Sequence, residues 1–381
     1  MTAFAALGLA EPLLQALQAA DMIQPTPIQT EAIPVVMQGR DLIGLARTGT
    51  GKTASFVLPI LHRLLQTGER ADPGTCQALV LAPTRELARQ ICDAARTFGR
   101  RTTLRATTLV GGVPRDKQDR ALGNGIDLVV ATPGRLLDHL ASGTLRLHET
   151  SILVLDEADH MLDLGFIDEV RSVAEHLPAQ RQTLLFSATM PAPIAALAKH
   201  LLRNPVTIAT APPSSTAERI DHRIVFAEGG QKRALLVDML RGGRMERTLV
   251  FVRTKQNADA LLQALDSAGI RASAIHGDKS QAQRDRVLAD FRRGAFPVLV
   301  ATDVAARGID IPDLTHVVNY EIPDVPETYV HRVGRTARAG ARGIAISLCA
   351  GSERAALRNI EKLLGKRLRV YEGRQAAGRP V

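Results

Sequence analysis

The chain has 381 residues, of which 45% are hydrophobic and 23% charged, which is typical of a folded globular protein and excludes an intrinsically disordered one. At this length, two domains of ordinary size are expected. The net charge is +9, and three widely separated cysteines exclude a disulfide-stapled module and predict buried thiols in a reducing, cytoplasmic environment.

The first half alternates short apolar runs with helical patterns, which predicts an α/β fold with a mostly parallel sheet flanked by helices. Strands are expected at 42–45, 78–81, 127–130, 152–155 and 183–186. No run of about 18 apolar residues occurs, so no segment is expected to span a membrane. Because functional loops gather at the carboxyl ends of parallel strands, the residues after each run are the candidates for chemistry.

A glycine-rich turn follows the first run and leads into a helical pattern. It contains Ala46, Thr48, Gly49, Thr50, Gly51, Lys52 and Thr53. Backbone N–H groups of such a turn hold phosphates, while Lys52 reaches the β- and γ-phosphates and Thr53 holds Mg²⁺. Ala46 replaces the first glycine of the usual pattern, so the turn taken alone could also be an ordinary loop.

A carboxylate pair, Asp156 and Glu157, ends the fourth run. Asp156 is placed to hold hydrated Mg²⁺, and Glu157 to polarise the attacking water as general base. Such a pair is common by chance after an apolar strand. Together with the glycine turn on another strand of the same sheet, it predicts hydrolysis of a nucleoside triphosphate.

A segment rich in Pro and Ser separates the halves, which predicts domains at 1–207 and 218–371 with a linker at 208–217. Strands are expected in the second half at 248–252, 272–275, 298–300, 316–318 and 345–348. Residues 352–368 form an amphipathic pattern whose basic side is either the outside of a packed helix or an auxiliary RNA surface. Residues 372–381 predict a short disordered basic tail.

The charge excess lies entirely in the second half. Residues 1–207 contain 20 Lys and Arg against 20 Asp and Glu, whereas residues 208–381 contain 28 against 19. A basic half indicates either a polyanionic partner bound through its phosphates or a solubility surface.

With further motifs, the chain resembles the DEAD-box family of ATP-dependent RNA helicases from Phe4 to Gly340. These motifs are Pro25–Gln29, Pro83–Ala88, Gly111-Gly112, Thr132–Arg135, Ser187–Thr189, Val250–Thr254, His276-Gly277, Gln281 with Arg284, Ala301–Asp303, Ala306–Asp310 and His331–Arg338. The wording of Val318–Pro323 is most similar to the bacterial RhlE-type branch. The resemblance implies two tandem RecA-like domains with a cleft between them.

The resemblance implies ATP and Mg²⁺ as cofactors. Gln29 would recognise adenine, Phe4 would stack on it, and Asp310 would contact the ribose. Arg335 and Arg338 resemble the family's paired arginine fingers, which would require the two lobes to close.

Two positions depart from the family pattern. Asp21-Met22 replaces the usual Gly-aromatic pair, and Met22 can fill the same apolar space. Ala337 stands where glycine is more common, and its methyl group is expected to crowd the neighbouring backbone.

RNA binding is expected to use the sugar-phosphate backbone, because a 3% aromatic content without Trp disfavours a base-stacking surface. The resemblance implies RNA contacts by Thr84, Arg85, Gly111, Gly112, Thr132, Gly134, Arg135, Arg253, Thr254, Gln281, Arg284, Thr302 and Arg307. Taken singly, Gly111-Gly112 would be no more than a turn. Asp159, Ser187, Thr189 and His331 are expected to couple this surface to the nucleotide.

We therefore expect RNA-stimulated ATP hydrolysis coupled to lobe closure and to local, non-processive unwinding of short duplexes or RNP remodelling. One alternative is an ATP-gated RNA clamp without turnover, although Glu157, Arg335 and Arg338 are all present. The other is a DNA-directed translocase of superfamily 2. A monomer is expected, and ribosome assembly, RNA decay and cold adaptation all remain open as pathways.

Overall fold

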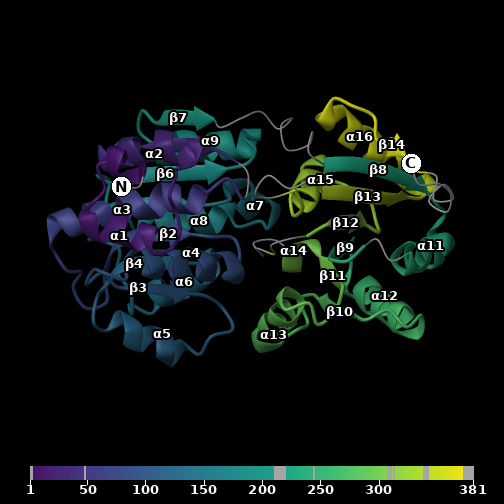
Figure 1. Ribbon diagram of the computed structural model, residues 1–381. Helices are drawn as coiled ribbons and strands as arrows, with labels where there is room; N and C mark the ends of the chain where they lie inside the picture. The colour runs from purple at the N-terminus through teal and green to yellow at the C-terminus, as the bar shows by residue number, and fades with distance from the viewer. Residues whose placement is uncertain are drawn as a thin grey trace. The chain divides into compact units, whose positions relative to one another are not determined.

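The computed structural model describes residues 3–46, 49–209, 220–242, 245–306, 311, 314–337 and 343–371. The chain divides into two compact units, Met1–Thr210 and Ala211–Val381 (Figure 1). Each unit contains one seven-stranded sheet in which every described strand pair is parallel. The prediction of two α/β units with parallel sheets is confirmed.

The first unit has strands β1 (Leu42–Leu45), β2 (Cys76–Leu81), β3 (Ala106–Leu109), β4 (Ile126–Ala131), β5 (Ile152–Leu155), β6 (Gln182–Ser187) and β7 (Val206–Ala209). Its helices are η1 (Ala3–Leu7), α1 (Glu11–Gln18), α2 (Pro27–Met37), α3 (Lys52–Thr67), α4 (Arg85–Phe98), α5 (Arg115–Leu122), α6 (Pro133–Ala141), α7 (Ala158–Asp163), α8 (Ile167–Glu175) and α9 (Ala192–Leu201). The strand order is β3-β4-β2-β5-β6-β1-β7.

Helices cover both faces of this sheet, so its central strands are apolar throughout. In β2, Ala78 and Val80 pack into the core beneath α1 to α4, whereas Leu79 and Leu81 pack into the core beneath α6 to α9. Burial on both faces explains why the strands form continuous apolar runs instead of alternating with polar residues.

The second unit has strands β8 (Ile220–Phe226), β9 (Thr248–Val252), β10 (Ala272–Ile275), β11 (Val298–Thr302), β12 (His316–Asn319), β13 (Gly343–Cys349) and β14 (Arg369–Val370). Its helices are α11 (Gly229–Arg241), α12 (Lys255–Ser267), α13 (Gln281–Arg292), α14 (Asp303–Ala306), α15 (Pro326–Val333), η2 (Gly351–Glu353) and α16 (Arg354–Leu364). The strand order is β10-β11-β9-β12-β13-β8-β14, the same permutation as in the first unit.

Several sequence expectations concern residues outside the described ranges, namely Thr48, Arg307, Asp310, Arg338, the segment 210–217 and the tail 372–381. Strand β7 continues through Ala209 and pairs with β1, so the sheet extends two residues into the segment expected to be a linker. Among the helices that the structure describes, none is long and apolar enough to cross a membrane.

Candidate functional site

The phosphate-type turn lies between β1 and α3. Gly49 and Gly51 have φ angles of +85° and +91°, a region that favours glycine. Lys52, the first residue of α3, is 5% exposed, and its Nζ lies 3.8 Å from Asp156 Oδ1. Ala46 is buried and its N–H donates to the Ser187 carbonyl. The described part of the turn therefore combines left-handed glycines with the buried ammonium group of Lys52.

Asp156 follows β5 and is almost entirely buried. Burial raises the pKa of its carboxyl to about 6, the nearby Lys52 ammonium opposes this rise, and Glu157 adds to it. Its Oδ1 also accepts a hydrogen bond from the Glu157 N–H at 2.9 Å. The carboxylate is incompletely compensated by its protein neighbours, so a bound cation would stabilise its charged form.

Glu157 has a left-handed backbone, with φ of +53°, which is uncommon for a residue with a side chain. His160 is buried one helical turn later, and its Nδ1 lies 3.3 Å from Glu157 Oε2. Sequence reasoning did not single out His160, whose spacing three residues after Glu157 was the available signal. The contact holds one carboxylate oxygen of the candidate general base.

Asp159 joins the ends of β5 and β6. Its Oδ2 accepts hydrogen bonds from the Ala188 N–H at 3.2 Å and from the Thr189 N–H and Oγ1, both at 2.9 Å. Its own N–H donates to Ser187 Oγ at 3.2 Å. The structure therefore brings together three of the four residues expected to couple the sites, while His331 lies on α15 of the second unit.

Two residues expected to bind adenine, Gln29 and Phe4, are both buried. Gln29 Oε1 accepts from the Thr26 N–H at 2.9 Å, and its Nε2 donates to the Gly51 carbonyl at 3.1 Å. This amide therefore links α2 to the phosphate turn. Phe4 is 0% exposed, because η1 inserts its ring into the core. Stacking of Phe4 on a base therefore stays a prediction, which would require this ring to leave the core, and Met22 packs against the same apolar core.

The motifs divide the carboxyl edge of the first sheet into two neighbouring parts. Residues expected to bind RNA follow β3, β4 and β2, whereas those expected to bind the nucleotide follow β5 and β1, with the coupling residues Ser187 and Thr189 at the end of β6 between them. These are consecutive strands in the sheet order. One edge therefore presents two continuous surfaces that meet between β2 and β5.

The candidate RNA residues of the first unit lie on three loops. Thr84 caps α4, and its Oγ1 accepts from the Leu87 N–H at 3.2 Å. Thr132 precedes α6, which contains Gly134 and Arg135, and Arg135 Nη1 donates to the Val113 carbonyl at 3.2 Å. A side-chain carbon added at Gly111 would lie 2.9 Å from the Arg85 guanidinium, so the glycine loop packs directly against Arg85.

The second unit places its candidates after the equivalent strands β10, β11 and β9. Thr254 caps α12, with Oγ1 accepting from the Asn257 N–H at 3.1 Å. Arg253 Nη2 donates to the Ile322 carbonyl at 2.9 Å and to Asp324 Oδ1 at 3.2 Å. Arg284 donates to the Ala305 carbonyl at 3.3 Å, and Thr302 ends β11. Gln281 begins α13, and its side chain is outside the described part.

Arg335 lies just after α15, is 5% exposed, and donates from Nε to the His331 carbonyl at 3.3 Å. Sequence reasoning missed its neighbour Arg332, which is 2% exposed. Arg332 Nε and Nη2 donate to the two carboxylate oxygens of Asp303 at 2.6 and 2.7 Å, and its guanidinium lies 5.1 Å from the centre of the Phe251 ring. This bidentate pair ties α15 to α14, directly after β11.

Ala337 has a φ of +58°. This left-handed backbone is a region that favours glycine. The expected crowding concerns the backbone near Arg338, which lies outside the described residues.

Comparison with family models matches residues 26–197 to the DEAD/DEAH box helicases and residues 231–340 to the helicase conserved C-terminal domain. The chain is 42% identical to the DEAD-box ATP-dependent RNA helicase CshA of Geobacillus kaustophilus, covering 97% of this chain and 78% of that protein. It is 44% identical to CshA of Listeria monocytogenes, covering 97% and 70%. These relatives do not support the RhlE-type branch indicated by Val318–Pro323.

Solved structures give the same result. S. cerevisiae Dbp5 bound to RNA and ADP BeF3 aligns with a TM-score of 0.87 and 34% identity, covering 97% of this chain and 96% of that one. Mss116p bound to ssRNA and AMP-PNP aligns with a TM-score of 0.85 and 27% identity, covering 96% and 78%. The family models, the similar sequences and the solved structures therefore all indicate the same protein family.

Proposed function

The chain belongs to the DEAD-box family of ATP-dependent RNA helicases, and we propose that both of its units bind ATP and RNA, so that ATP hydrolysis depends on bound RNA. The proposal rests on the carboxyl edge of the first sheet, where the RNA motifs and the nucleotide motifs occupy adjacent strands. A single sheet edge can then transmit the state of one ligand to the other.

For hydrolysis, we assign the phosphates to the turn before α3 and to Lys52. A water attacks the γ-phosphorus, Glu157 accepts the proton of that water, and the bond to the β-phosphate oxygen breaks to release ADP. The left-handed backbone of Glu157 and the contact from His160 fix the accepting oxygen. Phosphoryl transfer depends mainly on such positioning and on charge stabilisation.

The donor set fits Mg²⁺. The Asp156 carboxylate lies beside Lys52, and Thr53 follows Lys52 in α3, so a carboxylate and a hydroxyl are available as oxygen ligands. Mg²⁺ commonly binds through one carboxylate, waters and substrate phosphates. When bound, the ion would neutralise charge on the phosphate oxygens. It would also offset the burial that raises the pKa of Asp156.

For RNA, we propose that Thr, Gly and Arg at the ends of β3, β4 and β2, and of β10, β11 and β9, bind the sugar-phosphate backbone. Neither set offers aromatic rings on which bases would stack, which agrees with recognition independent of sequence. The relatives named above with bound RNA and nucleotide support simultaneous binding.

Coupling follows from linkage. If ATP and RNA both favour a closed arrangement of the units, with Arg335 reaching the γ-phosphate, each ligand strengthens the binding of the other. Closure that bends one strand would displace its complement over a short duplex. Asp159 is the connection we assign to this step, because it joins the ends of β5 and β6.

The test is steady-state ATP hydrolysis without nucleic acid, with single-stranded RNA and with single-stranded DNA. RNA should stimulate wild-type turnover, and Glu157→Gln should abolish turnover while preserving ATP-dependent RNA binding. Equal stimulation by DNA would contradict the assignment to RNA. Wild-type RNA binding gated by ATP without any hydrolysis would indicate a clamp instead.

A further inference from the structure

The loop 110–113 connects β3 to α5 and contains the glycine pair expected to contact RNA. A single side chain on α5 bonds to both of its ends. Gln118 Oε1 accepts from the Val110 N–H at 2.9 Å, and its Nε2 donates to the Val110 carbonyl at 3.4 Å and to the Val113 carbonyl at 3.1 Å. The side chain is buried, with 4% exposure for the residue. One amide therefore sets the distance between the two ends of the loop.

A second loop is hydrogen-bonded to the same backbone segment, residues 110–113. Arg135, from the motif after β4, donates from Nη1 to the Val113 carbonyl at 3.2 Å, so that carbonyl accepts from both Gln118 and Arg135. The Arg85 guanidinium, from the motif after β2, packs against Gly111 and Gly112. All three RNA motifs of the first unit therefore converge on the loop that Gln118 holds.

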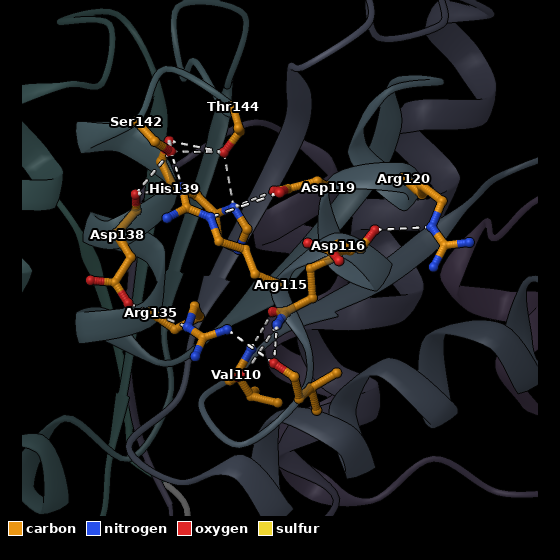
Figure 2. A network of polar contacts seen from close by, with 12 residues as sticks. Val110, Arg115, Asp116, Asp119, Arg120, Arg135, Asp138, His139, Ser142 and Thr144 are labelled. Carbon is orange, nitrogen blue, oxygen red and sulfur yellow. Dashed lines mark hydrogen bonds and ion pairs between the residues drawn. The ribbon is translucent and has the colours of Figure 1, made fainter.

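Helix α5 is itself fixed to α6, which keeps the Gln118 amide in place. Arg115 donates to the Asp138 carbonyl at 3.2 Å and also to Ser142 Oγ (Figure 2). Asp119 Oδ1 lies 3.2 Å from Nδ1 of the buried His139. His139 Nδ1 also lies 2.9 Å from Thr144 Oγ1, its hydrogen-bond partner. Burial lowers the pKa of His139, which favours its neutral form. These contacts hold α5, and with it Gln118, in a fixed position relative to α6.

We infer that Gln118 is a positioning residue for RNA binding, which acts by holding the backbone of residues 110–113 in the form that RNA phosphates contact. The inference rests on the proposed RNA role of this surface. Gln118 is buried and lies outside the nucleotide motifs, so it should determine RNA affinity without changing the hydrolysis of ATP.

Gln182 provides a matched control. It is also a buried glutamine of the first unit with 4% exposure, and its Nε2 donates to the Val36 and Arg40 carbonyls at 3.1 and 2.6 Å. It begins β6 and therefore lies at the opposite, amino edge of the sheet. A purely structural effect of losing a buried amide should appear equally in both positions.

The experiment compares Gln118→Met and Gln182→Met in the full chain, because methionine has similar length and cannot make these hydrogen bonds. Affinity for a fluorescent single-stranded RNA is measured with a non-hydrolysable ATP analogue, and ATPase activity is titrated with RNA. For Gln118→Met, RNA affinity should fall about tenfold and the RNA concentration for half-maximal stimulation should rise by the same factor. Its kcat at saturating RNA and its KM for ATP should stay within about twofold of the wild type.

Gln118→Asn keeps the amide but shortens its reach, so it should give an intermediate affinity and serves if the Met variant does not fold. Equal RNA affinity in wild type and both Gln118 variants would overturn the inference, as would an equal loss in Gln182→Met. A wild-type protein unresponsive to RNA would instead refute the proposed function, so the two failures are distinguishable.

Discussion

Asp156 is a carboxylate with 2% exposure and one ammonium group 3.8 Å away. Burial makes its charged form costly, and Lys52 offsets only part of that cost, since the pKa remains raised. The Asp156 carboxylate is therefore suited to bind a cation, and in the absence of a cation its charged form does not stabilise the folded protein.

This arrangement predicts a pH-dependent stability difference between wild type and Asp156→Asn. The pKa of Asp156 rises from 3.8 in the unfolded reference to about 6 in the folded protein. Between these values the folded state binds more protons than the unfolded state, so its free energy of unfolding falls as pH rises through this window. Asparagine has no charge to bury, so the variant should gain stability relative to wild type from pH 4.5 to 7.5.

Urea unfolding in the absence of Mg²⁺ measures this difference at both pH values. Addition of Mg²⁺ and ATP should stabilise the wild type more than the variant, because only the wild type has the carboxylate. A difference that does not change with pH would mean that Asp156 is already ionised at low pH.

Single residues also show what a sequence motif can predict. Lys52, Asp156 and Glu157 can be proposed as catalytic candidates because their chemistry depends on residue type and on spacing within a motif, and the structure places Lys52 3.8 Å from Asp156. His160 and Gln118 were missed because their roles depend on which atoms they meet after folding. A glutamine in a polar helix has no local pattern that distinguishes it from an ordinary exposed residue.

At the scale of elements, the contact between α14 and α15 is an ion pair between the buried Arg332 and the partly exposed Asp303. Arg332 makes two hydrogen bonds to Asp303 and also donates from Nη1 to Asn319 Oδ1 at 3.2 Å and to the Glu321 carbonyl at 2.7 Å. The pair links the end of β11 to the helix preceding Arg335.

Asp303→Ala should therefore leave the buried Arg332 guanidinium without its carboxylate. Because the Asp303 side chain is 23% exposed, the expected cost lies at the lower end of the range for buried pairs, about 3 kcal/mol. Hydrogen exchange measured by mass spectrometry on the full chain should show reduced protection in β9, β11 and α15. Strands of the first unit are the internal control. The double variant Asp303→Leu with Arg332→Met should recover part of the loss, and unchanged protection in Asp303→Ala would contradict this account.

Elements also differ in how well the sequence predicts them. Central strands such as β5 and β9 were predicted with their observed bounds, because burial on both faces makes them continuously apolar. The strands β3, β7 and β14 were missed, and each lies at the edge of its sheet. Strand β8 was missed because Asp221 and Arg223 alternate with buried residues. Partial exposure removes the apolar signal.

At the scale of the whole molecule, each unit contributes two described arginines to the proposed RNA surface, Arg85 and Arg135 from the first and Arg253 and Arg284 from the second. Counter-ion release gives each neutralised phosphate of a single strand a slope of about −0.7 in the plot of log affinity against log salt. The slope therefore reports how many units bind the strand at once.

Arg307 of the second unit was also assigned to RNA from the sequence, so five arginines are expected to bind phosphates. We expect a slope of about −1.4 when RNA binds the first unit alone without nucleotide, and about −3.5 with a non-hydrolysable ATP analogue that promotes binding to both. Arg253→Gln should reduce only the second value, by about 0.7. Arg96→Gln changes the same charge at an exposed position late in α4, away from the carboxyl edge, and should leave both slopes unchanged. Equal slopes with and without the analogue would exclude joint binding.

The two sheets have the identical strand order, so each strand of one unit has a counterpart in the other. The helix after β8 is therefore the counterpart of the helix that begins with Lys52, and its first turn likewise contains a buried lysine, Lys232. The Glu353 carboxylate lies 2.5 Å from the Lys232 ammonium. In the second unit an internal anion thus stands beside the lysine that corresponds in position to Lys52, for which we propose a phosphate as the partner.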